Sequence, residues 1–575
     1  MNNAKIAAAF DQVADLLEFK NSNPFRVRAY RKAARVVGDL PEAISDIVSD
    51  PERSLTDIDG IGKDLAEKCA ELISTGHLQM LDDLLEDTPR TVLDLMRVPG
   101  LGPKKAAAVF SELGVASLPE LKAACEAQQV RGLKGFGAKT EASILAGIEI
   151  ASAANQRLLW AEADAIAEEL RTFLASVESL EQIELAGSYR RGKDTVGDLD
   201  ILVVSRDAAA VMDRFATYPD LESIIGRGDT KMSIRLGNGF QVDLRVVPAE
   251  SFGAALQYFT GSKDHNVILR GKAKQMGLKI NEYGVYRTDT DEYVAGRTEA
   301  DVYRSLGLPE FPPELREARQ EFEWAEQGDL PKLIELDDMR GDLHMHTTAT
   351  DGTASIDEMA AAAQARGLSY IAITDHSQRV SMARGLTPAR ALEQWAEIDR
   401  WNAANKSRFL ILKGIECDIL ESGGLDLPDD VLSQADWVMA SVHYGQKQSA
   451  RQITDRILGA IRNPYVSAIA HPTGRLLNRR EAYEVHMDEV MQAAAEYGKL
   501  LELNANPHRL DLNDVDCAAA KKRGIPIVIS TDAHSIDGLD VMRFGIKQAR
   551  RAGLTASDVA NTQTWAQLKK RVGRS

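Results

Sequence analysis

In the first half of the chain, a glycine- and serine-containing turn precedes two carboxylates and a buried, strand-like apolar run. Asp198 and Asp200 are two residues apart, so their side chains face the same side of a strand. Carboxylates held side by side repel each other unless a divalent cation lies between them, and oxygen ligands suit Mg²⁺. Gly187, Ser188 and Arg191 can offer a polyphosphate backbone N–H groups, a hydroxyl and a planar bidentate cation. The stretch therefore predicts a magnesium-dependent site that handles phosphate groups.

A second strand can bring a third carboxylate to this pair. Residues 241–247 alternate between polar and apolar side chains, and Asp243 lies among them. Three aspartates from two strands can bridge two metal ions about 3.5–4 Å apart, which is the arrangement used for in-line nucleotidyl transfer. The alternative is that Asp198 and Asp200 only cap a turn before a strand. The arginine-containing turn upstream favours the metal site.

These residues resemble the palm of the family X DNA polymerases, the nucleotidyltransferase group that contains DNA polymerase beta. The run from Gly187 to Gly192 is similar to the triphosphate-binding motif of the family, and the three aspartates match its metal ligands. The resemblance implies that four residues contact the incoming triphosphate: Gly187, Ser188, Arg191 and Gly197. It also implies that Asp243 helps to activate the 3′-hydroxyl of a primer.

Residues 258–266 resemble the thumb-like segment of the same family, in which a Tyr-Phe-Thr-Gly run lies against the nucleotide sugar and disfavours ribose. The residues implied to contact the nucleotide or the template minor groove are Tyr258, Phe259, Gly261, Lys263, Asn266 and Arg270. Lys263 replaces an acidic residue of DNA polymerase beta, so its point charge should favour nucleotide binding even before a metal joins. A solvent-facing loop lysine is the alternative.

Before the palm, three glycine-containing turns each precede a helical pattern within about 80 residues. The glycine pairs are Gly60 and Gly62, Gly100 and Gly102, and Gly135 and Gly137. Such turns expose backbone N–H groups at a helix N-terminus, where a DNA phosphate can bind regardless of base sequence. They resemble helix-hairpin-helix motifs, and helix packing is the alternative. Residues 22–35 add five positive charges and no acid, so local charge favours DNA although the chain carries −17 overall.

Residues 23–34 resemble the small amino-terminal domain of DNA polymerase beta, in which a lysine forms a Schiff base with the sugar of an abasic site. The matching position is Lys68. An amine attacks an aldehyde only when it is unprotonated, which requires a depressed pKa. Asp64 lies one helical turn earlier, where the family pattern has a lysine, and its charge favours the protonated amine. Deoxyribose phosphate lyase activity and a plain Asp64–Lys68 ion pair are therefore competing interpretations.

Eight of the 10 histidines follow residue 338, and several stand directly after an apolar, strand-like run. The ligand-type residues at or just beyond such positions are His344, His346, Asp351, His376, Glu416, His443, His471, Asp532 and His534. Helical patterns alternate with these runs, which predicts a (β/α) barrel with its site at the carboxyl ends of the strands. Imidazole and carboxylate suit Zn²⁺, Mn²⁺ or Fe²⁺, and their number suffices for more than one ion.

This arrangement resembles the polymerase and histidinol phosphatase (PHP) domain, over residues 339 to about 540. The ligand set implied by the resemblance is His344, His346, Asp351, His376, Glu416, His443, His471, Asp532 and His534. The implied chemistry is phosphoester hydrolysis by metal-activated water. A small-molecule phosphatase and an inactive, metal-stabilised scaffold are the alternatives. Arg475 and Arg509 are interpreted as surface charges, with steering of DNA as the alternative.

At 575 residues the chain exceeds a single core. The expected domains are 1–88 helical DNA-binding, 89–150 helix-hairpin-helix fingers-like, 151–248 palm, 249–318 thumb-like, 319–338 linker and 339–575 PHP. With 44% hydrophobic and 27% charged residues, the composition is typical of a soluble globular protein. We expect no membrane span and no secretory signal. Four scattered cysteines indicate a reducing cytoplasm rather than a disulfide framework.

Both halves together resemble the bacterial family X DNA polymerases that carry a PHP domain. The implied fold class is multidomain, with helical helix-hairpin-helix domains, an α+β nucleotidyltransferase palm with a thumb, and an α/β distorted (β/α)7-type barrel. The implied function is gap filling by a DNA-directed DNA polymerase in base excision repair, with a metal-dependent 3′–5′ exonuclease in the PHP domain. Abasic-site endonuclease or 3′-phosphatase activity is an extension of that site, and a template-independent nucleotidyltransferase is the rival for the polymerase half.

The expected cofactors are Mg²⁺ at the polymerase site and several Mn²⁺ or Zn²⁺ ions at the PHP site. The expected partners are gapped or primer-template DNA and deoxynucleoside triphosphates. We expect a monomer that does not bind membranes.

Overall fold

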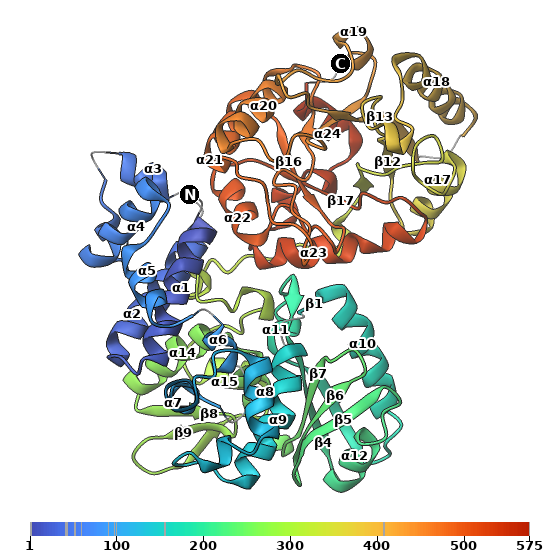
Figure 1. Ribbon diagram of the computed structural model, residues 1–575. Helices are drawn as coiled ribbons and strands as arrows, with labels where there is room; N and C mark the ends of the chain where they lie inside the picture. The colour runs from blue at the N-terminus through green and yellow to red at the C-terminus, as the bar shows by residue number, and fades with distance from the viewer. Residues whose placement is uncertain are drawn as a thin grey trace. The chain divides into compact units, whose positions relative to one another are not determined.

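The computed structural model describes residues 3–40, 44–50, 53–58, 60–89, 91–96, 98, 101–153, 157–405 and 409–573 (Figure 1). The chain divides into two compact units, the first made mainly of residues 1–157 and the second mainly of residues 158–575. Within the described ranges, no helix has both the length and the apolar character needed to cross a lipid bilayer.

The first unit consists of short helices around two separate apolar cores. Its helices are α1 (Asn3–Phe19), α2 (Pro24–Asp39), α3 (Ile44–Ser49), α4 (Lys63–Thr75), α5 (Gln79–Glu86), α6 (Val92–Leu95), α7 (Pro103–Leu113), α8 (Leu118–Glu126) and α9 (Ala138–Ala153). One core contains Phe10 and Tyr30, and the other contains Val109 and Ile144. Each predicted glycine turn lies directly before a helix, namely α4, α7 or α9.

The second unit begins with a five-stranded sheet in the order β2-β4-β7-β6-β5. Its strands are β2 (Leu180–Leu185), β4 (Asp198–Ser205), β5 (Leu221–Arg227), β6 (Lys231–Leu236) and β7 (Gln241–Val246). The accompanying elements are β1 (Leu158–Leu159), β3 (Thr195–Val196), α10 (Trp160–Leu174), α11 (Gly187–Arg190) and α12 (Ala208–Phe215). Strands β4 and β7 are neighbours, so the strand with the third aspartate lies beside the strand with the first two.

The thumb-like part combines helices with a three-stranded sheet in the order β10-β9-β8. Its elements are α13 (Phe252–Thr260), α14 (Lys263–Gln275), β8 (Leu278–Asn281), β9 (Gly284–Arg287), β10 (Tyr293–Ala295) and α15 (Glu299–Arg304). Residues 319–338, expected as a linker, contain α16 (Glu321–Gln327). In α16, Phe322 packs on the thumb core, and Glu321 lies 2.9 Å from Nδ1 of the buried His265.

The carboxy-terminal part is a nearly closed barrel of seven parallel strands in sequential order. The strands are β11 (Gly341–Asp342), β12 (Tyr370–Ile373), β13 (Leu410–Asp418), β14 (Trp437–Ser441), β15 (Ala468–Ile469), β16 (Leu500–Asn504) and β17 (Ile527–Ser530). A bridge between Met345 and Ala533 joins the two ends of the sheet. The helices are α17 (Ile356–Ala365), α18 (Pro388–Ala404), α19 (Asp429–Leu432), α20 (Ala450–Arg462), α21 (Met487–Tyr497), α22 (Asp514–Lys522), α23 (Met542–Arg551) and α24 (Trp565–Arg571). The predicted fold class is confirmed.

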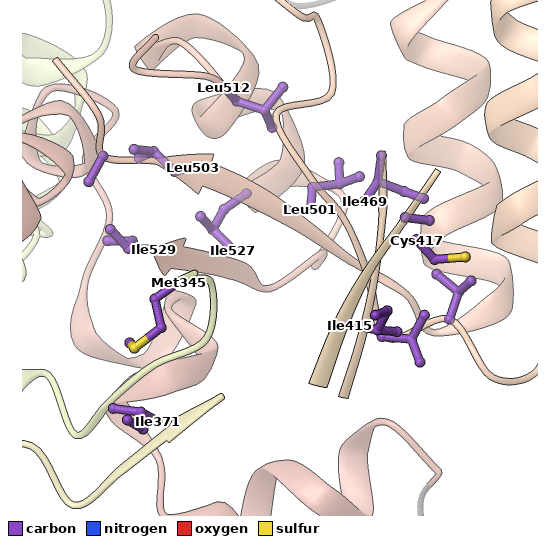
Figure 2. Packing of buried hydrophobic residues seen from close by; sticks show 14 of the residues in the cluster. Met345, Ile371, Ile415, Cys417, Ile469, Leu501, Leu503, Leu512, Ile527 and Ile529 are labelled. Carbon is purple, nitrogen blue, oxygen red and sulfur yellow. The ribbon is translucent and has the colours of Figure 1, made fainter. Parts of the chain in front are cut away.

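Alternation along the strands separates two apolar clusters in the barrel. Ile371, Ile415 and Ile529 belong to the large cluster between strands and helices, shown in part in Figure 2. Their strand neighbours Ala372 and Val528 belong to a second cluster. Glu416 follows Ile415 in β13, so it shares the side of the strand opposite the helix-facing core. Side chains alternate between the two faces of each strand, so in β13 one face contributes to the apolar core and the other carries Glu416.

We predict that Ile529→Ala destabilises the barrel by about 3 kcal/mol, because it leaves a cavity in a tightly packed place. Ile529 is fully buried, and a Cβ atom added at Gly545 of α23 would lie only 2.6 Å from its Cγ2 atom. Calorimetry of the full chain should show a lower melting temperature for the barrel. Ile536→Ala is the control, because Ile536 is 37% exposed and its truncation should leave the transition nearly unchanged. Equal shifts for both variants would contradict the packing argument.

Candidate active sites

The palm aspartates lie on the two neighbouring strands β4 and β7. Burial, followed by the charges of Asp198 and Asp243, raises the pKa of Asp200 to about 7. The two neighbouring carboxylates thus disfavour the charged form of Asp200, and a divalent cation would relieve this repulsion. The three aspartates are not packed into a tight ligand set, because every described group of three or more ligands with donor atoms within 4.8 Å lies in the barrel.

The predicted triphosphate-binding turn lies against these aspartates. Gly187 adopts a φ of +64°, and a Cβ atom there would lie 2.6 Å from Oδ2 of Asp200. Glycine is therefore needed both for the backbone conformation and for the close approach. Ser188 follows within the one-turn helix α11, and Gly197 directly precedes β4. The turn thus lies beside Asp200, and its role in triphosphate binding stays a prediction.

The two arginines of the turn have different partners. Arg190 donates to both carboxylate oxygens of Glu299, at 2.9 and 2.7 Å, and so ties the turn to the thumb. Arg191 donates from Nε to Oε1 of Glu317 at 3.0 Å and from a terminal nitrogen to the carbonyl oxygen of Thr260 at 2.5 Å. Arg190 therefore connects the turn to the thumb, whereas the guanidinium of Arg191 is held in place by neighbouring acceptors.

The thumb residues matched to nucleotide contacts gather around the end of α13. The rings of Tyr258 and Phe259 are edge to face, with centroids 5.1 Å apart. The amide of Asn266 accepts from Gln257 at 2.7 Å and donates to the carbonyl oxygen of Tyr258 at 2.8 Å. Asn266 thus braces Tyr258 in this structure, and a direct contact with nucleotide stays a prediction. Three further predicted residues lie close by: Gly261, with a φ of +68°, and the exposed Lys263 and Arg270.

In the first unit, Lys68 lies 2.5 Å from Oδ1 of Asp64. Burial alone would lower the pKa of Lys68, but the hydrogen bond and charge of Asp64 raise it above its ordinary value. The ion pair is therefore present, and the amine is held in its protonated, non-nucleophilic form.

The glycines predicted to bind phosphate lie in the same unit. Positive φ angles occur at Gly60 and Gly135, and open space surrounds the Cβ positions of Gly62, Gly102, Gly135 and Gly137. Gly100 lies outside the described residues.

The barrel brings all nine predicted ligands together. Three groups have donor atoms within 4.8 Å: His346, Asp351, His376 and His534; His344, His346 and Glu416; and His376, Glu416 and His443. Because His346, His376 and Glu416 each belong to two groups, the arrangement suits neighbouring metal ions with shared ligands. The other two ligands adjoin them: Nε2 of His471 lies 3.0 Å from Glu416, and Oδ1 of Asp532 lies 3.2 Å from His346.

Several buried nitrogen and oxygen atoms that could bind a metal ion in this cluster make no hydrogen bond within the described chain. They are Nε2 of His344, Nδ1 of His346, Nδ1 of His376 and Oε2 of Glu416. Nδ1 of His376 lies 2.7 Å from Oε2 of Glu416, but without hydrogen-bond alignment. A buried polar atom without a partner costs about 1–3 kcal/mol. Divalent metal ions would satisfy all four atoms, so the residues fit a multinuclear metal centre.

The imidazoles divide into two kinds. Burial opposes protonation of His376, but the charge of Glu416 raises its pKa to about 10. The pKa of His344 is also raised well above its usual value, since Glu502 and other carboxylates outweigh burial. By contrast, burial and then the charges of His376 and His534 lower the pKa of His346 to about 4. Metal binding therefore requires loss of protons at His344 and His376 but not at His346.

Supporting residues that the sequence analysis did not predict orient these ligands. Glu502 accepts from Nδ1 of His344 at 2.7 Å and from the backbone N–H of His471 at 2.6 Å. Asp418 accepts from the backbone N–H of His443 at 3.0 Å. Such partners fix ring orientation and tautomer. Glu502 lies on β16, a strand absent from the runs found in the sequence. The signal available was an acidic residue within an apolar run, Leu500–Asn504.

Arg475 and Arg509, interpreted as surface charges, are only partly exposed, and Arg509 lies beside the ligand cluster. Nε of Arg509 lies 3.5 Å from Oδ2 of Asp532, and its side chain is only 20% exposed. Arg475 donates to the carbonyl oxygen of Arg509 at 2.9 Å and thereby fixes its backbone. Arg509 places a guanidinium at the edge of the metal ligands, where it can pair with a phosphate. The sequence could not predict these positions, because both arginines pair with groups that are distant in the chain.

Comparison with family models agrees with this division of the chain. A helix-hairpin-helix domain matches residues 1–78, and a SAM-like helix-hairpin-helix tandem matches residues 92–149. The DNA polymerase beta palm matches residues 157–225, and the DNA polymerase beta thumb matches residues 255–317. The PHP domain matches residues 342–506. Fold and sites define a two-centre, metal-dependent enzyme of phosphoester chemistry.

Individual relatives narrow this further. The chain is 41% identical to the DNA polymerase/3′-5′ exonuclease PolX of Bacillus subtilis, over 98% of each chain. It is 28% identical to DNA polymerase lambda of Rattus norvegicus over 51% of this chain and 52% of the relative. A probable phosphatase of a Thermoanaerobacter species is 33% identical over 38% of this chain and 89% of its own length. The chain therefore belongs to the PolX family, the family X DNA polymerases that carry a PHP domain.

We predict that Mn²⁺ releases protons when it binds the metal-stripped barrel at pH 7. His344 and His376 have raised pKa values and carry protons that coordination must displace, so affinity should rise from pH 6 to pH 8. Titration calorimetry in buffers of different ionisation enthalpy measures the protons released. The Asp198→Ala/Asp200→Ala variant isolates the barrel from the palm. A binding enthalpy independent of the buffer would contradict the assignment of these histidines as protonated ligands.

Proposed function

We propose that the palm extends DNA primers in short gaps and that the barrel removes nucleotides from DNA 3′ ends. The observation that carries this proposal is the presence of two separate ligand sets, one of palm aspartates and one of nine barrel ligands. They occur in a chain that aligns over 98% of its length with a relative named for both activities. The protein is thus a DNA-directed DNA polymerase and a 3′–5′ exonuclease.

In the polymerase reaction, we assign the metal ions to the three aspartates and the triphosphate to the turn beside them. Bound Mg²⁺ would neutralise charge on the triphosphate and promote ionisation of the primer hydroxyl. Gly187, Ser188 and Gly197 offer backbone groups and a hydroxyl, and Arg191 offers a fixed guanidinium. The edge-to-face pair of Tyr258 and Phe259 supplies the apolar wall for the sugar, with Gly261, Lys263, Asn266 and Arg270 around it. The glycines of the helical unit hold DNA phosphates.

In the barrel, we assign the nine ligands to a multinuclear centre that would activate water for attack on the phosphodiester. Glu502 and Asp418 hold the imidazole ligands in orientation. Arg509 would pair with the substrate phosphate, because it is the guanidinium beside the ligand Asp532. Abasic-site endonuclease and 3′-phosphatase activities belong to the same proposal, since these substrates present related phosphoesters.

We further infer Mg²⁺ in the palm and Mn²⁺ or Zn²⁺ in the barrel, from the oxygen-only and the histidine-rich ligand sets. Base excision repair as the pathway, the cytoplasm as the location and the monomer as the working form remain proposals. The four buried, free cysteines are consistent with a reducing compartment. We propose the domain boundaries as stated above, with α16 assigned to the thumb because Phe322 packs on the thumb core.

A second candidate for the barrel is a small-molecule phosphatase, because relatives named as probable phosphatases align with this part of the chain alone. Competition between a small phosphomonoester and a labelled DNA 3′ end distinguishes the two. Preference for the DNA end supports the exonuclease. Hydrolysis of the small phosphomonoester with no DNA cleavage supports the phosphatase.

We predict that a 5′-labelled primer on a template is shortened in Mn²⁺ without nucleotides by the wild type and by Asp198→Ala/Asp200→Ala. His344→Ala should lower the rate by about 10-fold or more, since it removes one ligand of the group that also contains His346 and Glu416. With nucleotides added, His344→Ala should still extend the primer, whereas the double aspartate variant should not. His508→Ala is the control, because His508 is a histidine of the same domain outside the ligand set. A folded His344→Ala protein that degrades the primer at the wild-type rate would overturn the exonuclease assignment.

We predict weak deoxyribose phosphate lyase activity, because the pKa of Lys68 is raised by Asp64. Borohydride trapping on a 5′-deoxyribose phosphate substrate should give little covalent adduct with the wild type. Asp64→Lys, which restores the family residue, should increase trapping by about 10-fold, since a neighbouring cation lowers the pKa of Lys68. Lys68→Ala is the control. Efficient trapping by the wild type that disappears in Lys68→Ala would show that the ion pair does not suppress the reaction.

A further inference from the structure

The last turn of the barrel helix α23 contacts the triphosphate-binding turn of the palm. Arg551 ends this helix, and only 2% of its side chain is exposed. It donates to the carbonyl oxygen of Arg191 at 2.7 Å and to Oε1 of Glu317 at 3.0 Å, both from the same terminal nitrogen. Its other terminal nitrogen donates to Oδ2 of Asp514 at 2.8 Å. One buried guanidinium therefore binds the backbone of Arg191, the partner of the Arg191 side chain, and the barrel.

Glu317 is the link between the two arginines. Its Oε1 atom accepts from Nε of Arg191 and from Arg551, each at 3.0 Å, and its Oε2 atom lies 3.4 Å from Nζ of Lys193. Burial by itself would raise the pKa of Glu317, but Arg551, Lys193 and Arg191 together lower it to about 2. Glu317 is thus a permanent anion whose position depends on these cations.

The network remains charge-compensated without Arg551. Asp514 also accepts from Arg319 at 3.0 Å, and Glu317 also has Arg191 and Lys193. Removal of Arg551 therefore leaves neither carboxylate alone, which is the situation that makes loss of a buried partner strongly destabilising. The loss of Arg551 removes only the planar guanidinium group that binds both Glu317 and the Arg191 backbone. A residue with this position affects geometry more than folding.

We propose that Arg551, a residue of the PHP barrel, is a positioning residue of the polymerase reaction: it holds Glu317 and the backbone of Arg191 so that the Arg191 guanidinium is set for the incoming triphosphate. The inference rests on the proposed role of Arg191 in triphosphate binding. It makes the barrel a structural part of nucleotide binding in addition to its hydrolytic role. Arg551 bonds to Glu317, to the backbone of Arg191 and to Asp514, and it acts on the Arg191 guanidinium through the first two.

The test is steady-state gap filling on a one-nucleotide gap, with KM for the nucleotide and kcat measured separately. Arg551→Met keeps the aliphatic stem but removes the fork. It should raise KM by about 10-fold and change kcat by less than about 3-fold, because the lost interaction aids binding before chemistry. Arg550→Met is the matched control: Arg550 also bridges from α23, to Glu314 at 2.9 Å, but has no bond to Glu317. Its KM should stay within about 2-fold of the wild type.

Coupling through Glu317 is tested by a double-mutant cycle. The changes in log KM for Arg551→Met and Glu317→Ala should fail to add, with the double variant close to Glu317→Ala alone. Additive changes would overturn action through Glu317. A wild-type KM in Arg551→Met, or equal increases in the Arg551 and Arg550 variants, would overturn the positioning role.

Folding is checked by the exonuclease rate without nucleotides, which should match that of the wild type in both methionine variants. If Arg551→Met loses exonuclease activity as well, the KM of Arg551→Lys is the test. Lysine keeps the charge and the aliphatic stem but lacks the planar guanidinium group. A raised KM in Arg551→Lys supports the proposal, and a wild-type KM overturns it. The proposed polymerase function fails separately, if the wild type itself does not extend the gapped primer.

Discussion

Glu416 is a buried carboxylate with side-chain exposure of 1%, and a buried charge persists only when it is paired. Five histidines reach within 3.7 Å of it: His344, His346, His376, His443 and His471. His344 and His346 follow β11 and the other three follow separate strands, so they can meet only if the parallel strands of the barrel end at the same edge. The register of the sheet and the compensation of this charge therefore depend on each other, and the metal site belongs to the structural core of the domain.

The pKa values of ligand carboxylates shift in opposite directions at the two centres. In the palm, burial and the charges of two neighbouring aspartates outweigh nearby Arg245 and Lys231, and the pKa of Asp200 rises to about 7. In the barrel, imidazoles share protons with the carboxylates, and the pKa values of Glu416 and Asp532 fall well below their ordinary range. Oxygen-only ligands suit hard cations such as Mg²⁺. Histidine-rich ligands suit transition metal ions and Zn²⁺.

Ionic contacts also join the barrel to the palm and thumb. Arg550 pairs with Glu314, Arg543 pairs with Asp164 at 2.6 Å, and Arg475 lies 3.2 Å from Asp194. Arginine suits such places, because its planar group stays charged and can bind several acceptors at once. The interface therefore combines directional ionic contacts with an edge-to-face contact of Trp160 and Phe544, whose ring centroids lie 5.6 Å apart. An apolar interface of the same extent would hold the domains together without specifying the triphosphate-binding turn.

The sequence by itself determined the local features of both sites. Asp198 and Asp200 face the same side because strand geometry has a period of two, and ligand-type residues recur where apolar runs end. The fold class and the nine barrel ligands followed from these short-range patterns and from the resemblance that they carried. Local spacing is specified by the covalent chain, so it can be read without knowing how distant segments pack.

Only the tertiary structure decided the long-range pairings. Glu502 orients His344 across 158 positions, and Arg551 binds the backbone of Arg191 across 360 positions. Nothing in the spacing of such residues selects one partner over another. The same holds for Arg509, which lies beside Asp532. The physical reason is that a long side chain can pair with any complementary group that packing brings within reach, and packing is a property of the whole fold.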